Sequence, residues 1–398
     1  MSLDINKAAL QLFNASSLLQ KQYSDNTKAL DTAVKAFNEE NPNSLEKRRL
    51  QSKTTWLIPQ IPTLINLSKS PDGLLSNHIV AAVDGSHIDI DRHSSIQCYL
   101  INIGSALIKY GAESSALLRN SPLFCAEQSA LNIINPKGIG ELPIKGALMG
   151  LTRTIMEIEA LADIVDECPQ NVPILALLDG SLILWGLEGF PEYIKSEFIE
   201  KRMFTAMERL RKASDQRVFA VASHISFPGS SEVVNAMRIS SSICGWDTVN
   251  CDSNCRELAK GLRNCESLAN IKDSDLFRRI LGLNERSSVF SSTSKIVLDY
   301  YGENKIRFFY VNIGSEIVRL EIPEWTSSEG IEFAHSCIIS QTAKGNGYPL
   351  ALQEAHEQAV INGSDRTTFD HLLYENLSSL SLPTSTSQKS KSKRTRFI

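Results

Sequence analysis

Two short, continuously apolar segments of this chain end in the same triplet, Asp-Gly-Ser. The first run, at 79–83, continues into Asp84, and the second run, at 173–178, continues into Asp179. Such runs are typical of strands that are buried on both faces of a sheet. Side chains at the carboxyl ends of these strands line the crevice where open α/β sheets hold their ligands, and the glycine allows a tight turn there. The repeat therefore predicts an α/β core in which Asp84 and Asp179 face each other.

The remaining pattern alternates between helices and strands, as expected for an α/β or α+β fold. Hydrophobic residues make up 42% of the 398 residues, so a sizeable core can form. We expect helices at 152–165, 189–213 and 348–361, strands at 96–109 (broken at Gly104-Ser105) and 217–222, a hairpin formed by 295–300 and 305–311 with a third strand at 316–322, and irregular structure over 110–150.

The chain divides into three parts by composition. Residues 1–75 are polar and helix-prone and predict an N-terminal helical arm. Residues 76–376 would form the main domain, with an insertion at about 228–290. The last part, 377–398, is rich in Ser, Thr and Lys and is expected to be disordered. Its basic residues could hold a phosphate backbone or remain simply solvated; they are Lys389, Lys391, Lys393, Arg394 and Arg396.

Charge and cysteine content argue against a globally basic nucleic-acid-binding protein and against a disulfide-stabilised secreted protein. Lys and Arg number 41 against 45 Asp and Glu, so any nucleic-acid contact must be local. No secretory signal or long apolar run is recognised, and eight cysteines do not suggest a disulfide framework, so we expect a cytoplasmic protein with no membrane span. Cys244, Cys251, Cys255 and Cys265 lie within a short segment, but their spacing differs from that of a zinc ribbon. Free thiols are expected, and metal binding is left open.

Further candidate site residues lie on two of the predicted helices. Glu157 and Glu159 are two residues apart, which is about 200° around a helix, so both cannot face one site. Glu157 borders the apolar face and is the preferred candidate, although Glu159 competes with it. His356 follows Tyr348 by slightly more than two helical turns, so both side chains are expected on nearly one face.

This order of residues suits hydrolysis of a phosphodiester by two metal ions. Asp84 and Asp179 would repel each other when close, and a divalent cation relieves that repulsion. Two ions, about 3.5–4 Å apart, would activate a water and stabilise the leaving oxygen. Oxygen ligands favour Mg²⁺ or Mn²⁺, and the imidazole of His356 favours Mn²⁺.

Four segments resemble the NurA nucleases of DNA end processing, in particular their bacterial members. They are AAVDGS at 81–86, ALLDGSL at 176–182, VASHISFPGSSEVVNAMR at 221–238 and GYPLALQEAHEQAVI at 347–361. The resemblance covers about residues 78–365. It implies a ribonuclease-H-like mixed sheet flanked by helices, and a homodimer. It also implies Mn²⁺-dependent 5′–3′ exonuclease and single-strand endonuclease activity in DNA end resection and double-strand break repair, with a HerA-type hexameric ATPase as partner.

The same resemblance assigns roles to the candidate residues. It implies Asp84, Glu157, Asp179 and His356 as metal ligands, and these residues together with Tyr348 as the catalytic set. Family members often carry a basic residue after the strand at 217–223, where this chain has Ser223-His224. Two alternatives remain: a degenerate nuclease that serves as a scaffold for the ATPase, and an actin-like phosphotransferase, whose paired Asp-Gly loops hold nucleotide phosphates.

Overall fold

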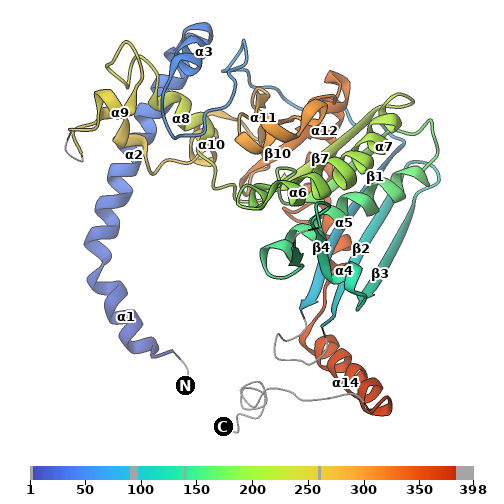
Figure 1. The fold of residues 1–398 in the computed structure, drawn as a ribbon. Coiled ribbons are helices and arrows are strands. Elements are labelled where there is room, and N and C mark those ends of the chain that lie inside the picture. Colours follow the sequence, from blue (N-terminus) through green and yellow to red (C-terminus); the bar gives the residue numbers. More distant parts are fainter. Residues whose placement is uncertain (1–2, 90–96, 139, 259–260, 382–398) are drawn as a thin grey trace. The chain divides into compact units, whose positions relative to one another are not determined.

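The computed structural model describes residues 3–89, 97–138, 140–258 and 261–381, and these form two compact units (Figure 1). The first unit comprises the described residues of Met1–Pro71, Ile225–Lys295 and Lys305–Glu321, and the second comprises those of Asp72–His224, Ile296–Asn304 and Ile322–Ile398. Each unit is assembled from separate stretches of the chain. The sequential boundaries at 75 and 376 therefore describe a different division, and they remain predictions.

The second unit is built on a mixed sheet whose strands run in the order β3-β2-β1-β6-β7. The pairs β1–β2 and β2–β3 are antiparallel, whereas β1–β6 and β6–β7 are parallel. Strand β6 is apolar and buried until its last residue, as its continuous hydrophobic run predicts. The strands are β1 (His78–Asp89), β2 (Tyr99–Tyr110), β3 (Ser115–Cys125), β6 (Ile174–Asp179) and β7 (Phe219–Ile225). The expected mixed α/β architecture is confirmed.

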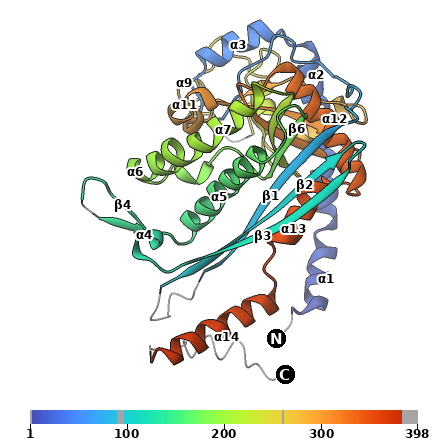
Figure 2. The ribbon, with the colours of Figure 1, turned by 90° about the vertical axis from the view of Figure 1, so that its right-hand side faces the viewer.

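Helices cover both faces of this sheet (Figure 2). Helix α5 (Ala147–Asp166) packs on β1 from one side, and α13 (Leu350–Ala359) packs on β1 and β2 from the other. The other elements of the unit are α4 (Gln128–Leu131), β4 (Asn132–Ile134), β5 (Glu141–Pro143), η1 (Trp185–Leu187), α6 (Glu192–Lys195), the π-helical η2 (Ser196–Met203), α7 (Phe204–Ser214), α11 (Lys295–Tyr300), η4 (Gly302–Asn304), α12 (Ser328–Lys344) and α14 (Gly363–Ser379).

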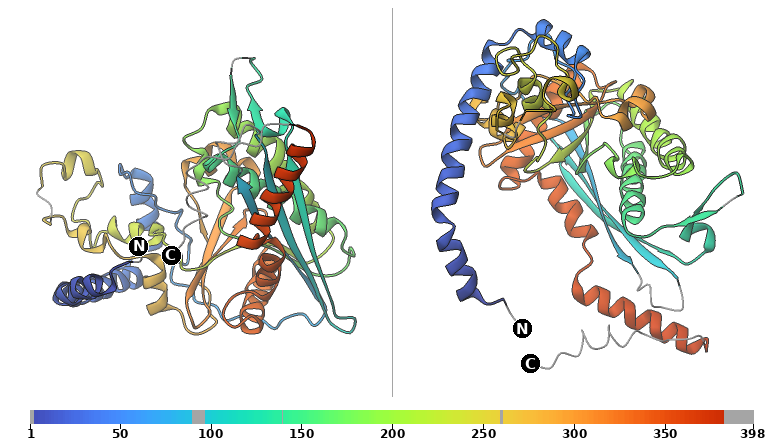
Figure 3. Two further views of the ribbon diagram at one scale, coloured as in Figure 1. Left: turned by 90° about the horizontal axis from the view of Figure 1, so that it is seen from below. Right: turned by 60° about the vertical axis from the view of Figure 1, so that its left-hand side comes forward.

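The first unit joins N-terminal helices to the segment after β7. Helix α2 buries Ala29, Ala33, Ala36 and Phe37 in a core that also contains Phe277, Phe290 and Tyr310. Helix α1 has no buried residue, and Figure 3 shows that it continues into α2 from the N-terminal end. The elements are α1 (Ile5–Asn14), α2 (Ser16–Glu39), α3 (Pro42–Gln51), α8 (Glu232–Arg238), α9 (Cys251–Asn254), η3 (Asn264–Leu268), α10 (Asp273–Ile280), β8 (Phe290–Ser291), β9 (Ile306–Asn312) and β10 (Ile317–Pro323).

Strand β1 does not end at its Asp-Gly-Ser triplet, as the sequence had suggested. It continues to Asp89, because the triplet remains paired with β2 in antiparallel register. Strand β2 is likewise unbroken at Gly104. At both positions glycine serves close packing against a helix instead of a turn.

The predicted hairpin around residues 302–304 is also wrong. Residues 295–300 form α11, in which the adjacent residues Ile296 and Val297 are buried and Leu298 is 54% exposed, so the apparent alternation was misleading. Residues 110–150, expected to be irregular, contain β3. All of its residues before Cys125 are exposed, so it lacks the half-buried alternation that marks most strands.

Two remaining expectations concern the ends of the chain and the membrane. Helix α14 includes residues up to Ser379, and the basic residues from Lys389 onward lie outside the described part. Within the described ranges, no helix has both the length and the apolar character that crossing a bilayer requires.

Candidate functional site

The two repeated aspartates lie on neighbouring parallel strands of the second unit. Val83 is paired with Leu178, so Asp84 and Asp179 follow as the next residues of β1 and β6. Each carboxylate accepts a hydrogen bond from the N–H of the glycine that follows it, at 2.7 Å for Asp84 and 3.0 Å for Asp179. Only the second triplet turns, at Gly180, where φ is +86°. The shared sequence therefore produces the same local carboxylate contact in two different backbones.

Helix α13 reaches Asp84 because β2 carries glycine opposite it. Gly104 is the register partner of Asp84, and a Cβ at Gly104 would lie 2.2 Å from the carbonyl oxygen of Ala355. This close approach allows Nδ1 of His356 to lie 2.7 Å from Oδ2 of Asp84. The His356 side chain remains 59% exposed, so it is open to solvent.

Polar side chains of the sheet hold the carboxyl end of α13 in place. The amide of Asn102 donates to the carbonyl oxygens of Gln358 and Ala359, at 3.0 and 2.9 Å. Ser86, from the first triplet, also donates to the carbonyl oxygen of Ala359. These bonds satisfy carbonyls that have no partner within the helix. Ser86 thus positions the helix that carries His356.

Glu157 approaches the site from the opposite face of the sheet. A Cβ at Gly85 would lie 2.6 Å from its Oε1, so only glycine leaves room for this carboxylate. The Glu157 residue is 6% exposed, and Oε1 accepts no hydrogen bond from any described residue. Burial, and to a lesser extent the charges of Asp84 and Asp179, raise the pKa of Glu157 to about 8, while Arg153 opposes the shift.

Arg153 is a site residue that the sequence reasoning missed. Its Nε lies 3.1 Å from Oε1 of Glu157, in an ion pair whose geometry is poor for a hydrogen bond. Arg153 precedes Glu157 by one helical turn, and the spacing i, i+4 is the signal that could have identified it. Its side chain is 34% exposed, so its charge is accessible to an anion.

Tyr348 and His224 surround the second aspartate. Tyr348 lies just before α13, and its hydroxyl donates to Asp179. Burial raises the pKa of Asp179, the charge of Asp84 adds to this, and the bond from Tyr348 opposes it. The Tyr348 ring packs edge-on against His224, with ring centroids 5.4 Å apart. Burial lowers the pKa of His224 to about 4, so this residue is neutral and supplies no cation for a phosphate.

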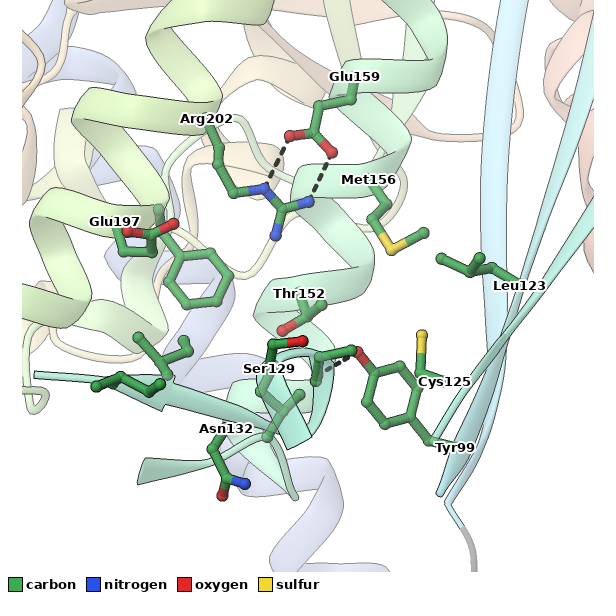
Figure 4. A pocket seen from close by; sticks show the side chains of 15 residues that line it. Tyr99, Leu123, Cys125, Ser129, Asn132, Thr152, Met156, Glu159, Glu197 and Arg202 are labelled. Carbon is green, nitrogen blue, oxygen red and sulfur yellow. Dashed lines mark hydrogen bonds and ion pairs between the residues drawn. The ribbon is translucent and has the colours of Figure 1, made fainter. Parts of the chain in front are cut away.

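Glu159, the competitor of Glu157, points elsewhere. Arg202 of η2 donates to both of its oxygens, at 2.8 and 2.6 Å (Figure 4). This pair lines a separate cavity of about 540 Å³, together with side chains such as Met156 and Thr152 of the same helix. The structure therefore brings Glu157 to the aspartates and pairs Glu159 with a different partner.

The arrangement has the chemistry of a site for a hard divalent cation. Asp84, Glu157 and Asp179 supply oxygen atoms, His356 supplies an imidazole, and an unsatisfied buried oxygen of Glu157 is directed at the strand that carries Asp84. Such carboxylates are stable as anions only when a cation compensates them. Within the part of the chain that the structure describes, no three of these side chains are already close enough to hold an ion. An ion could be held here only after side chains move, for example after Asp84 separates from His356.

Comparisons with known proteins identify a family. The sequence model of the NurA domain matches residues 78–361. Among solved structures, the crystal structure of the NurA nuclease from Sulfolobus solfataricus is similar over 94% of this chain and 97% of that chain, with a TM-score of 0.51 and 12% sequence identity. This likeness concerns the fold. No curated protein matches the sequence.

Two more distant structures have lower scores. The catalytic domain of human Endonuclease V is similar over 77% of this chain and 85% of that chain, at 12% identity and a TM-score of 0.27. LC9-RNase H1, a type 1 RNase H with the type 2 active-site motif, is similar over 44% and 75%, at 11% identity and a TM-score of 0.21. At these scores neither structure adds to the argument.

Proposed function

Because the chain belongs to the NurA family, we propose that it is a metal-dependent DNA nuclease that hydrolyses phosphodiester bonds at the Asp84–Asp179 site. One observation carries this proposal. Glu157 is a buried carboxylate beside two aspartates, and one of its oxygens accepts no hydrogen bond from any residue within the described ranges. A scaffold protein gains nothing from this costly arrangement, whereas a site for divalent cations requires it.

Asp84, Glu157, Asp179 and His356 would hold the metal, with Mn²⁺ favoured and Mg²⁺ as the alternative, in a pair of ions. When bound, such ions supply a water of lowered pKa and positive charge against the phosphate oxygens. Tyr348 orients Asp179 through its hydroxyl. His356, whose side chain is 59% exposed, would hold the second ion or orient the leaving oxygen.

Arg153 has a separate role in this proposal. Its Nε lies 3.1 Å from Oε1 of Glu157, and its charge opposes the rise in the pKa of that carboxyl group. Once Glu157 is a metal ligand, the partly exposed guanidinium is free to contact a DNA phosphate with two N–H groups. It would thereby fix the register of the strand without reading its sequence.

The finer properties rest on family membership. We propose 5′–3′ exonuclease activity on single- and double-stranded DNA and endonuclease activity on single strands, in end resection during double-strand break repair. A HerA-type hexameric ATPase is the proposed partner and a homodimer the proposed assembly. The cytoplasmic location expected from the sequence also remains a prediction.

The decisive experiment uses purified protein and end-labelled DNA, incubated with Mn²⁺, with Mg²⁺ or with a chelator. We expect cleavage with Mn²⁺, weaker cleavage with Mg²⁺ and none with the chelator. Asp84→Ala and Asp179→Ala should lower the rate at least about 1,000-fold, because each removes an oxygen that holds the catalytic charge.

Asp163→Asn is the matched control, because Asp163 lies on the same helix as Glu157 but is paired with Arg209 at the surface. It should retain full activity. Full activity of Asp84→Ala, or undiminished cleavage in the chelator, contradicts the proposal. Folded protein that neither cleaves DNA nor binds Mn²⁺ supports the scaffold alternative instead.

A further inference from the structure

The first unit contains a group of four cysteines that differ from the other four. Cys98, Cys125, Cys168 and Cys337 are buried, as is usual for cysteines that act as small hydrophobic residues. In contrast, Cys244, Cys251, Cys255 and Cys265 are all only partly buried. Thiols that remain accessible in this way can react with a metal.

The fold places these four cysteines in one region of the first unit. One turn of helix, α9, places Cys251 and Cys255 on the same side, with the N–H of Cys255 bonded to the carbonyl of Cys251 at 3.2 Å. Cys265 lies near enough to the other three for their charges to act on it. Cys244, Cys255 and Cys265 line one cavity of about 280 Å³. The irregular spacing of the four cysteines along the chain is thus compatible with their lying near one another in the folded protein.

Burial and the neighbouring cysteines raise the pKa of Cys255 and Cys265, whereas nearby donors and arginines oppose this shift. The indole N–H of Trp246 donates to the sulfur of Cys255, a contact of the kind that supports metal-bound sulfur. Arg238 acts on Cys265 and Cys251, and Arg263 acts on Cys255. Four thiolates around one divalent ion leave excess negative charge, and these arginines offset it. Cys244 and Cys265 also pack against the hydrophobic core, which limits access of water.

We propose that Cys244, Cys251, Cys255 and Cys265 form a structural zinc site that ties residues 244–258 and 261–265 to the core of the first unit. Four sulfur ligands are typical of closed, non-catalytic zinc sites, and the three-residue gap between Cys251 and Cys255 is within the usual range. In the described residues the thiols do not yet form a cage that could hold an ion. The site therefore closes as zinc displaces the thiol protons.

Two measurements on the full-length protein test this proposal. We expect about one tightly bound zinc ion per chain by elemental analysis, either as purified or after titration of the reduced protein. Replacement by Co²⁺ should give the intense sulfur-to-cobalt charge-transfer absorption of a tetrahedral thiolate site. Cys251→Ser and Cys255→Ser, chosen because neither packs on the core, should each lose both signals.

Matched variants separate this site from the nuclease site. Cys168→Ser, which changes a single buried cysteine of the second unit, and Asp84→Ala should both keep zinc and the cobalt spectrum. If reduced wild-type protein titrated with Co²⁺ gives no sulfur-to-cobalt absorption, the proposal is overturned. Retention of zinc by both Cys251→Ser and Cys255→Ser overturns it as well.

Discussion

Glu157 shows how one residue can combine a cost to the fold with a use in the site. Its carboxylate fits only because Gly85 has no side chain, and Arg153 compensates its charge incompletely. Without a metal the group holds a proton at neutral pH, since burial raises its pKa to about 8. With a metal it is an anion. Protonation and metal binding therefore compete for the same oxygens.

This competition predicts a specific pH dependence of stability in metal-free protein. The folded-state pKa of Glu157, about 8, lies above the unfolded value of 4.5. The contribution of protonated Glu157 to the free energy of unfolding is therefore fully present below pH 4.5 and is lost as pH rises through 8. The loss attributable to Glu157 should be on the order of 4 kcal/mol. Urea unfolding of wild type and Glu157→Gln between pH 5 and 9 measures it, and the variant should have the flatter profile. An equal pH dependence in both proteins contradicts this assignment.

At the scale of elements, the packing of α13 against β2 decides where His356 lies. Gly104→Ala would place a methyl group 2.2 Å from the carbonyl of Ala355, so the helix must shift. We expect a loss of about 1–3 kcal/mol in stability. DNA cleavage should fall at least about 10-fold, because a small misplacement of a catalytic group is costly.

Gly189→Ala is the control for this substitution. Its added Cβ would meet no atom within 4 Å, and it belongs to the same unit. It should be nearly neutral in both urea unfolding and DNA cleavage. If Gly104→Ala is equally neutral in both measurements, the close contact between α13 and β2 does not position His356.

The elements that the sequence could predict are those in which buried residues recur at the regular spacing of a helix or form a continuous run typical of a buried strand. The apolar run of β6 and the apolar face of α5 can be recognised in the sequence. These patterns also indicate where Asp179 and Glu157 lie on the two elements. Strand β3 could not be recognised, because it is exposed and held mainly by its bonds to β2. The continuation of β1 through Gly85 could not be predicted either. Glycine is needed there because the Glu157 side chain, more than 70 residues away in the sequence, packs against it.

At the scale of the whole molecule, the two units carry different chemistry. The proposed nuclease site would use carboxylates of the second unit, whose aspartates lie at the ends of paired segments of neighbouring strands. The cysteine group belongs to the first unit, where the short helices α9 and η3 carry Cys251 and Cys265. Soft sulfur ligands select Zn²⁺ over Mn²⁺, so Mn²⁺ should not displace zinc from the cysteines.

Hydrogen exchange can test this separation, because a bound ion protects the segments that its ligands belong to. Saturating Mn²⁺, at about 100 times its dissociation constant, should stabilise the protein by about 2.7 kcal/mol. It should slow exchange in β1, α5, β6 and α13, and leave 244–265 unchanged. Removal of zinc should speed exchange in 244–265 and leave those four elements unchanged. Asp84→Ala should abolish only the first effect and Cys255→Ser only the second. Protection of 244–265 by Mn²⁺ in wild-type protein would show instead that the two sites are coupled.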